Sequence, residues 1–170
     1  MNEAPTTAPD HVLPTFSENL GHILETNALM CVITKNGAQG ETVVRAALAH
    51  HGQSDPVVLT TVAPGSLSAL LDAFHDALHL GPRPRLRADA QQAVEDELAR
   101  QARPVLVVHE AHQLRAEALE YLYWLWNHFQ KRDIRLPVVL LGPERLTSVL
   151  SRPRLASLKS CIFIWQRLAS

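Results

Sequence analysis

A chain of 170 residues, of which 46% are hydrophobic, suits one domain with an ordinary core, since a domain of this size buries about 70% of its unfolded surface. No apolar run approaches the roughly 20 residues that span a bilayer, and the N-terminal sequence lacks a basic-then-apolar export signal. We therefore expect a soluble, cytoplasmic protein without a membrane partner. Two cysteines, Cys31 and Cys161, exclude a disulfide framework, and we expect both to be buried, reduced thiols.

The net charge is only −1, but it is unevenly distributed along the chain. Residues 1–130 carry eight basic and fifteen acidic side chains, whereas residues 131–170 carry eight basic and two acidic ones, a local charge of +6. Such asymmetry is found on surfaces that bind nucleic acid or acidic proteins, although a solvated face has the same composition. Within this segment Arg152 and Arg154 are candidate contacts for a partner or nucleic acid, and a turn at Pro153 with solvated arginines is the alternative.

The first residues predict a flexible arm, followed by a single domain. Residues 1–14 hold three prolines and almost no apolar periodicity, so we place the arm there and the domain at 15–170. From Phe16 onward, Leu20 and Ile23 recur on one helical face, which predicts an amphipathic helix. Residues 28–33 then form an apolar run typical of a buried strand.

The segment TKNGAQGET at 34–42 predicts a glycine loop between this strand and a helix that opens at Thr42. Gly37 and Gly40 permit close backbone approach, and the amides before Thr42 lie at a helix N-terminus, where anions are favoured. This strand, loop and helix order is the context that a phosphate-binding loop requires. A glycine-containing turn between any strand and helix has a similar sequence, so the motif alone is weak evidence for a phosphate-binding loop.

The rest of the sequence, from residue 56 onward, alternates between short apolar runs and amphipathic helices. Strands are predicted at 56–62, 104–108, 136–141 and 161–165, and helices at 66–80, 89–102 and 116–130, with Asp89 as the cap of the second helix. This alternation predicts an α/β fold of three layers, with a parallel sheet covered by helices on both faces. Tyr121 and Trp124 lie away from the predicted core positions of the last helix, so a face that carries them could contact a partner, although a helix enclosed by its neighbours is the simpler interpretation.

The strand at 104–108 leads into the sequence His109-Glu110-Ala-His112. Two histidines and a glutamate suggest zinc, but the zinc-protease signature H-E-x-x-H places its histidines four apart on a helix. Here they are three apart and start on a strand. We therefore expect no metal site at this position.

The runs VLVVHEAHQLRAEALEYLYWLWN, LPVVLLGPERLTSVL and RPRLASLKS resemble AAA+ P-loop ATPases of the origin-recognition and transposition-helper type, including secretion- and transposon-associated ATP-binding proteins. The resemblance covers about residues 16–165 and implies a parallel sheet in the order 5-1-4-3-2. It also implies that the helical lid of the family is lacking, because the sequence ends soon after the fifth strand. The implied nucleotide pocket comprises Gly37, Gly40, Glu41, Thr42, His109 and Glu110.

Several positions differ from the family pattern. Glu41 stands where the lysine is expected, His109 where the metal-binding acid is expected, and Pro143 where a polar sensor is expected. A carboxylate about 4 Å from a phosphate is repelled by roughly 4 kcal/mol at an effective dielectric of 20, and imidazole is a poor ligand for Mg²⁺. Glu110 alone remains as a vestigial catalytic candidate.

These departures predict a catalytically degenerate AAA+ domain without a cofactor. It would act as a binding or regulatory module that joins intact ATPase subunits, another copy of itself or the DNA machinery of a mobile element. Two alternatives remain open at this point. One is an ATP-binding AAA+ ATPase with atypical motifs, which would bind ATP or ADP with Mg²⁺ weakly, and the other is a nucleic-acid-binding protein that uses the basic C-terminal segment.

Overall fold

The structure is a computed structural model, and it describes residues 8–53, 55–60 and 64–168. Strands and helices alternate along most of the chain. The elements are α1 (Ala8–Thr26), β1 (Leu29–Ile33), α2 (Gly37–His50), β2 (Val57–Thr60), α3 (Leu67–Ala77), α4 (Arg87–Arg100), β3 (Leu106–His109), the 3-10 turn η1 (Ala111–Gln113), α5 (Ala116–Lys131), β4 (Val138–Gly142), α6 (Arg145–Leu150), the 3-10 turn η2 (Pro153–Leu155), α7 (Ala156–Cys161) and β5 (Ile162–Arg167).

The five strands form one parallel sheet in the order β2-β3-β4-β1-β5. This confirms both the α/β fold class and the predicted strand order. The interior strand β1 is buried along its whole length, and it pairs with β4 on one side and β5 on the other. The neighbours of β1 are thus the last two strands of the sequence, because the chain crosses from β1 out to β2 at the edge, returns through β3 to β4 and then crosses over β1 to β5.

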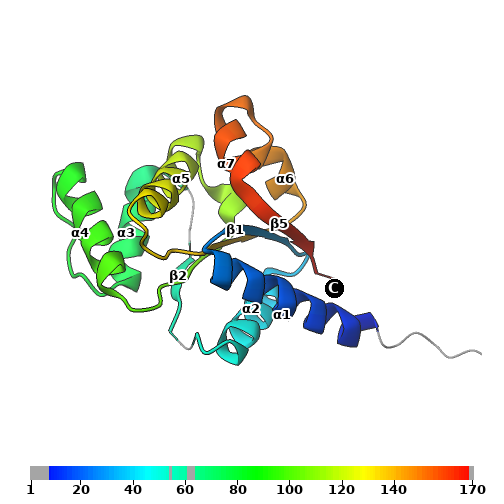
Figure 1. The fold of residues 1–170 in the computed structure, drawn as a ribbon. Coiled ribbons are helices and arrows are strands. Elements are labelled where there is room, and N and C mark those ends of the chain that lie inside the picture. The colour runs from blue at the N-terminus through cyan, green and yellow to red at the C-terminus, as the bar shows by residue number, and fades with distance from the viewer. Residues whose placement is uncertain (1–7, 54, 61–63, 169–170) are drawn as a thin grey trace, which may run out of the picture.

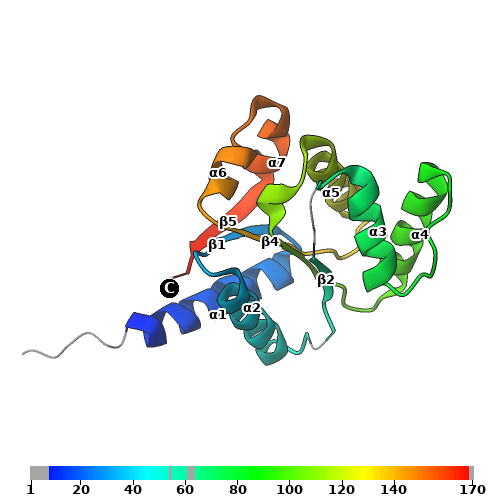
Figure 2. The same ribbon diagram turned by 180° about the vertical axis from the view of Figure 1, so that it is seen from behind.

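Helices cover both faces of the sheet. Helices α1 and α2 lie on one face, and α3 to α7 lie on the other (Figures 1 and 2). Along β1 the side chains alternate between the two cores, so that Met30 and Val32 pack with α1 and α2, whereas Leu29, Cys31 and Ile33 pack with the larger group of helices. Burial on both faces explains why β1, β3 and β4 are continuous buried runs rather than alternating patterns.

Helix α1 begins at Ala8, which corrects the prediction of a flexible arm at 1–14. Residues 1–7 lie outside the described residues. Pro9 stands in the first turn, where backbone N–H groups have no partner within the helix, and Pro14 removes one further donor without ending the helix. The apolar face predicted from the sequence is fully buried, with Phe16 and Leu20 each 0% exposed.

Asn27 joins the turn between α1 and β1 to the opposite side of the sheet. Its backbone φ of 58° is left-handed, a conformation that asparagine tolerates better than most residues. Its side-chain oxygen accepts the Leu136 N–H, and its amide donates to the Ile134 carbonyl at 3.3 Å. Its own carbonyl accepts from Trp126 Nε1 at 3.0 Å and from the Gln130 amide. One residue therefore holds α1, α5 and the entry to β4 together.

Two of the predicted boundaries are wrong. Helix α4 begins at Arg87, so Asp89 lies in its first turn rather than at the cap, where it still complements the positive end of the helix. Cys161 is the last residue of α7 and only partly buried, instead of lying buried in the last strand. Cys31 is buried as predicted, and burial raises the pKa of its thiol to about 12, which keeps it inert.

The edge strand β5 exposes large apolar side chains. Phe163 is 62% and Trp165 is 41% exposed on one face, whereas the intervening Ile164 packs against the core beneath α1. On α5, Tyr121 is buried and Trp124 is 45% exposed. None of the helices in the described ranges has the length and apolar character that crossing a bilayer requires.

Candidate functional site

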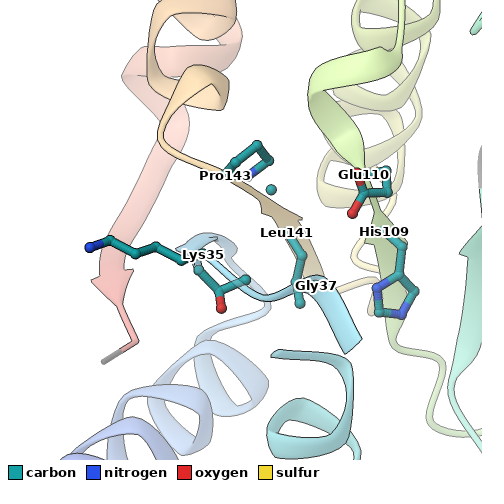
Figure 3. A pocket seen from close by; sticks show the side chains of 8 residues that line it. Lys35, Gly37, His109, Glu110, Leu141 and Pro143 are labelled. Carbon is teal, nitrogen blue, oxygen red and sulfur yellow. The ribbon is translucent and has the colours of Figure 1, made fainter. Parts of the chain in front are cut away.

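A pocket of about 240 Å³ opens where the carboxyl ends of β1, β3 and β4 meet the start of α2 (Figure 3). Crevices at the carboxyl ends of parallel strands are the usual ligand sites of open α/β sheets. Three of the residues proposed from the sequence, Gly37, His109 and Glu110, line it. The full lining is Thr34, Lys35, Gly37, His109, Glu110, Leu141, Gly142 and Pro143.

The connection between β1 and α2 is shorter than predicted. Helix α2 begins at Gly37 rather than at Thr42, so the segment expected to be a glycine loop forms the first turn of the helix. Asn36 is the cause, because it caps this turn. Its side chain accepts the Gln39 N–H at 3.1 Å, and its carbonyl accepts the Gly40 N–H at 2.9 Å. These bonds supply the partners that a helix start otherwise lacks.

Gly40 is required here for packing rather than for positive φ. It is buried in α2, and a Cβ atom added to it would lie 2.7 Å from Thr34 Cγ2. Thr34 is itself only 5% exposed, and its hydroxyl accepts the Asn36 N–H at 3.3 Å and donates to the Asn36 carbonyl at 3.1 Å. Thr34, Asn36 and Gly40 therefore form one tightly packed corner beneath the pocket.

Glu41 and His109 meet across the boundary between α2 and β3. Glu41 Oε1 lies 3.6 Å from His109 Nε2 and 3.4 Å from Arg45 Nε. Burial lowers the pKa of His109, and the nearby carboxylate of Glu41 opposes this effect. Near neutral pH, the side chain that faces Glu41 from the strand is therefore an uncharged imidazole.

Glu110 follows the end of β3 in a left-handed conformation, with φ 51° and ψ 43°. Its carboxylate lies against the start of α2, because a Cβ atom added to Gly37 would be 2.8 Å from Glu110 Oε1. Its other oxygen is 3.6 Å from His112 Nε2. Burial lowers the pKa of His112 as well, against the opposing effect of Glu110. Lys35 points away from Glu110 in Figure 3.

Thr42 lies outside the pocket lining. Its side chain is exposed on α2, and its hydroxyl donates to the Ala38 carbonyl within the same helix at 3.0 Å. Helix α2 starts before this residue, so Thr42 stands in its second turn instead of at its N-terminus. The structure therefore brings together Gly37, His109 and Glu110, with Glu41 in contact behind them, and separates Thr42 from this group.

The family described as AAA domain matches residues 24–150, which is most of the chain. The chain belongs to this AAA domain family. A search of curated proteins finds no match.

Solved structures of AAA+ ATPases share the fold of this AAA domain. Cdc6p from Pyrobaculum aerophilum matches with a TM-score of 0.73 at 15% identity, over 99% of this chain and 46% of that chain. The Aeropyrum pernix ORC1 protein, solved in complex with DNA, matches with a TM-score of 0.64 at 15% identity, again over 99% and 46%. The RuvB Holliday junction branch migration motor of Thermotoga maritima matches with a TM-score of 0.50 at 20% identity, over 91% and 44%. The chain thus spans about half the length of these proteins, and at such identities the likeness concerns the fold alone.

Arg152 and Arg154 contribute nothing to the pocket of this AAA domain. Arg154 lies in the turn η2, and its guanidinium donates two hydrogen bonds to the carboxylate of Glu120 on α5, at 2.7 and 3.0 Å. This pairing raises the pKa of Arg154. Arg152 precedes the turn and is exposed. One of the two candidate arginines is therefore already paired within the domain.

Three residues of the site were not predicted from the sequence, namely Asn36, Arg45 and Thr34. Asn36 precedes a helix and is a favoured capping residue, so its position was a readable signal for an earlier helix start. The pairing of Glu41 with Arg45 follows from their spacing of four on one helix. The role of Thr34 had no such signal, because it depends on the packing of Gly40 against it.

Proposed function

We propose that this AAA domain neither hydrolyses Mg-ATP nor binds it tightly, and that it serves as a binding or regulatory module. The observation that carries the proposal is the contact between Glu41 and His109, Oε1 to Nε2 at 3.6 Å. A phosphate loop G-x-x-x-x-G-K-[ST] places its lysine at position 41 of this chain, and the strand that follows places a metal-binding acid at 109. The cation and the acid are thus replaced by an acid and a neutral imidazole.

The electrostatic consequence of Glu41 is large. Where a lysine attracts the terminal phosphates, a carboxylate repels them by roughly 4 kcal/mol at 4 Å and an effective dielectric of 20. Arg45 contacts Glu41 and offsets part of this repulsion, but both side chains are partly exposed, which weakens the pair. Because each 1.4 kcal/mol corresponds to about tenfold in affinity, even a fraction of the repulsion weakens binding of a triphosphate by orders of magnitude.

The remaining donors also fit Mg-ATP poorly. The neutral imidazole of His109 replaces an oxygen ligand, which Mg²⁺ prefers, and the Thr42 hydroxyl is directed to its own helix. The amides of Gln39 and Gly40, which would cradle phosphate in a loop, bond to Asn36 instead. The pocket of about 240 Å³ is also smaller than the ~300–1,000 Å³ typical of small-molecule sites.

The proposed role as a binding module rests on the AAA fold of this domain. Drosophila ORC has been solved bound to DNA and Cdc6, and its chain shares this fold at a TM-score of 0.63 and 13% identity. We therefore propose a protein partner, either intact ATPase subunits or a second copy of this chain. Contact with the DNA machinery of a mobile element is part of the same proposal, and we assign the exposed Arg152 to it.

Calorimetric titration with Mg-ATP tests this function. We expect no measurable binding to the wild-type protein and no turnover above background. Binding should appear in the double variant Glu41→Lys, His109→Asp, because it restores the cation and the metal ligand together. Glu18→Lys is the control for the Glu41→Lys change, since it makes that same charge change at an exposed position of α1.

Two results of these experiments would count against the proposal. Tight Mg-ATP binding by the wild-type protein, with turnover that Glu110→Gln abolishes, would contradict the proposal and favour an ATPase with atypical motifs. Gain of binding in Glu18→Lys as well as in the double variant would show that overall charge, rather than the pocket, controls affinity.

A further inference from the structure

A second cavity, of about 290 Å³, lies at the opposite edge of the sheet from the candidate nucleotide pocket. Four of its polar lining residues each come shortly before a strand, namely Glu25 before β1, Gln53 before β2, Arg103 before β3 and Arg135 before β4. The amino ends of parallel strands meet at one edge of a sheet, so these side chains gather there although they are far apart in the sequence. We call this space the amino-end cavity. The five residues of β1, at about 3.3 Å each, separate it from the nucleotide pocket by roughly 16 Å.

Gln53 places an unpaired polar group at the wall of the amino-end cavity. The residue is only 8% exposed, and its backbone N–H donates to the Leu48 carbonyl at 2.8 Å. Its side-chain carboxamide makes no hydrogen bond to any residue that the structure describes. Buried amides are normally paired, because burying one without a partner is unfavourable. The Gln53 carboxamide is therefore available to a ligand in the cavity.

Two guanidinium groups face the same space with most of their donors unused. Arg135 donates one N–H to the Leu24 carbonyl at 3.4 Å. Arg103 has neither a hydrogen bond nor an ion pair within the described ranges, and its Nη1 would lie 3.6 Å from a Cβ atom on Gly52. Two cations at one cavity repel each other, and an oxyanion between them would accept charge-assisted hydrogen bonds from both. The lining therefore favours an anionic ligand.

His51 fixes the wall of the cavity between α1 and α2. Its Nε2 lies 2.8 Å from the Ser17 carbonyl, which can only accept, so this nitrogen carries a proton. The ring covers Gly21, where an added Cβ atom would be 2.9 Å from Cε1. Glycine is unfavourable in the middle of a helix, and here it leaves room for the ring. The cavity is thus formed in advance, as small-molecule sites usually are.

The charge and size of the amino-end cavity indicate which anion it suits. Besides His51, its charged side chains are two arginines and Glu25, a sum of +1, and Glu25 has no ion pair among the residues described. One carboxylate balances this charge, whereas a phosphate monoester, with about −1.5 to −2 at pH 7, exceeds it. The volume lies at the lower end of the ~300–1,000 Å³ typical of small-molecule sites, which suits a small group rather than a nucleotide.

We propose that the amino-end cavity binds a single carboxylate, which accepts hydrogen bonds from Arg103 and Arg135 and from the Gln53 amide. This site goes beyond the proposed function, since it lies at the other edge of the sheet and needs no nucleotide. The carboxylate belongs either to a small molecule or to an acidic side chain of a partner protein. Both sources present the same group to the two arginines.

Titration of the ¹⁵N-labelled protein with acetate at constant ionic strength tests the site. The side-chain amide signals of Gln53 should shift until the site is saturated, and methyl phosphate should bind less tightly than acetate. Arg103→Gln and Arg135→Gln should each weaken acetate binding about tenfold or more, because each removes a hydrogen bond to a charged group. Arg85→Gln is the matched control, since it removes an exposed arginine from the loop before α4, and it should bind like the wild-type protein.

Gln53→Leu distinguishes a ligand-binding amide from a structural one, and its missing signals identify those of Gln53. It should weaken acetate binding severalfold. The melting temperature of the free variant should equal or exceed that of the wild-type protein, because an unpaired buried amide is replaced by an apolar group. A lower melting temperature would show that the amide is paired in the folded protein, which would contradict its assignment to a ligand.

Two peptides distinguish the sources of the carboxylate. One is a pentapeptide with blocked ends and one glutamate between glycines, and the other carries glutamine instead. Tighter binding of the glutamate peptide than of acetate, with no binding of the glutamine peptide, would assign the site to a side chain of a partner protein. Equal affinities for acetate and the glutamate peptide would assign it to a small molecule.

Three results would overturn the proposal. They are unchanged Gln53 signals with both acetate and the glutamate peptide, tighter binding of methyl phosphate than of either carboxylate, and wild-type affinity in both Arg103→Gln and Arg135→Gln. None of them bears on Mg-ATP binding at the other edge of the sheet, which the calorimetric titration decides by itself.

Discussion

Glu41 and His109 bring an acid on α2 against an imidazole on β3. Oε1 of Glu41 lies 3.6 Å from Nε2 of His109. His109 is 7% exposed, and burial lowers its pKa below the ordinary 6.5. The contact thus belongs to the neutral form of the ring, and acid should weaken the folded state through this residue.

We predict that stability falls as the pH drops below about 6.5, because the unfolded chain takes up a proton at His109 before the folded chain does. This contribution is fully present above pH 6.5 and is lost as the pH falls through the depressed pKa of the folded state. Urea unfolding at a series of pH values measures it. His109→Gln should reduce the slope without abolishing it, since burial shifts His112 in the same direction.

His50→Gln is the control for this experiment, because His50 is exposed at the end of α2. Its pH dependence should match that of the wild-type protein. A slope in His109→Gln as steep as that of the wild-type protein would show that the acid sensitivity has another source.

Helix α2 starts earlier than the sequence predicts, and the cause can be identified. Two glycines within four residues argue against a helix, because each costs about 1 kcal/mol relative to alanine. The structure nevertheless continues the helix through Gly40, since Thr34 leaves no room for a side chain there and Asn36 caps the turn. Contacts between separate elements therefore outweigh the low helix propensity of the two glycines. Of these contacts, only the capping by Asn36 could be predicted from the sequence.

Gly40→Ala should destabilise the domain by about 1 kcal/mol, because overpacking costs about 1–3 kcal/mol and exceeds the gain in helix propensity of about 1 kcal/mol. The clash is with Thr34 Cγ2, which the added Cβ would approach to 2.7 Å. Thr34→Ser removes this methyl group and keeps the hydroxyl. In the Thr34→Ser background, Gly40→Ala should be neutral or stabilising. Urea unfolding of the wild-type protein, the two single variants and the double variant measures this effect. Equal effects in both backgrounds would rule out this clash as the cause.

The edge strand β5 should tolerate polar substitutions on its exposed face. Phe163 is 62% exposed, so Phe163→Thr should change the free energy of unfolding by less than about 0.5 kcal/mol. Self-association at high concentration should decrease, because exposed apolar edge strands promote pairing between chains. Sedimentation velocity and urea unfolding measure the two effects. Ile164→Thr is the contrasting variant, since this side chain packs against the core, and equal costs at both positions would contradict the assignment.

At the scale of the whole molecule, the architecture was predictable, and so were three residues of the pocket, whereas the contacts between those residues were not. Alternating apolar runs and helices indicated a parallel α/β sheet, and the family resemblance supplied the strand order, because both depend on patterns that span many residues. The contact of Glu41 with His109 and that of Glu110 with Gly37 join residues about 70 apart in sequence. No spacing rule reaches that far. Pro9 and Pro14 argue against a helix at 8–14, yet Pro9 stands in its first turn and Pro14 removes one donor without ending it.

Asn27 is the position where one substitution should affect the whole domain. Asn27→Ala loses hydrogen bonds to Ile134 and Leu136 and forces alanine into the left-handed region, so it should cost about 2–4 kcal/mol. Asn27→Gly accepts the backbone conformation and should cost less. Urea unfolding followed by tryptophan fluorescence measures both, since Trp126 also bonds to Asn27. Wild-type stability of Asn27→Ala would contradict this role.

The position of β1 between β4 and β5 has a consequence for synthesis on the ribosome. Residues 29–33 are translated more than 100 residues before their partners, residues 138–142 and 162–167. A nascent chain therefore carries an apolar strand without either neighbour while the intervening residues are made. Such a strand requires shielding by helices already formed or by chaperones until both partners have been translated.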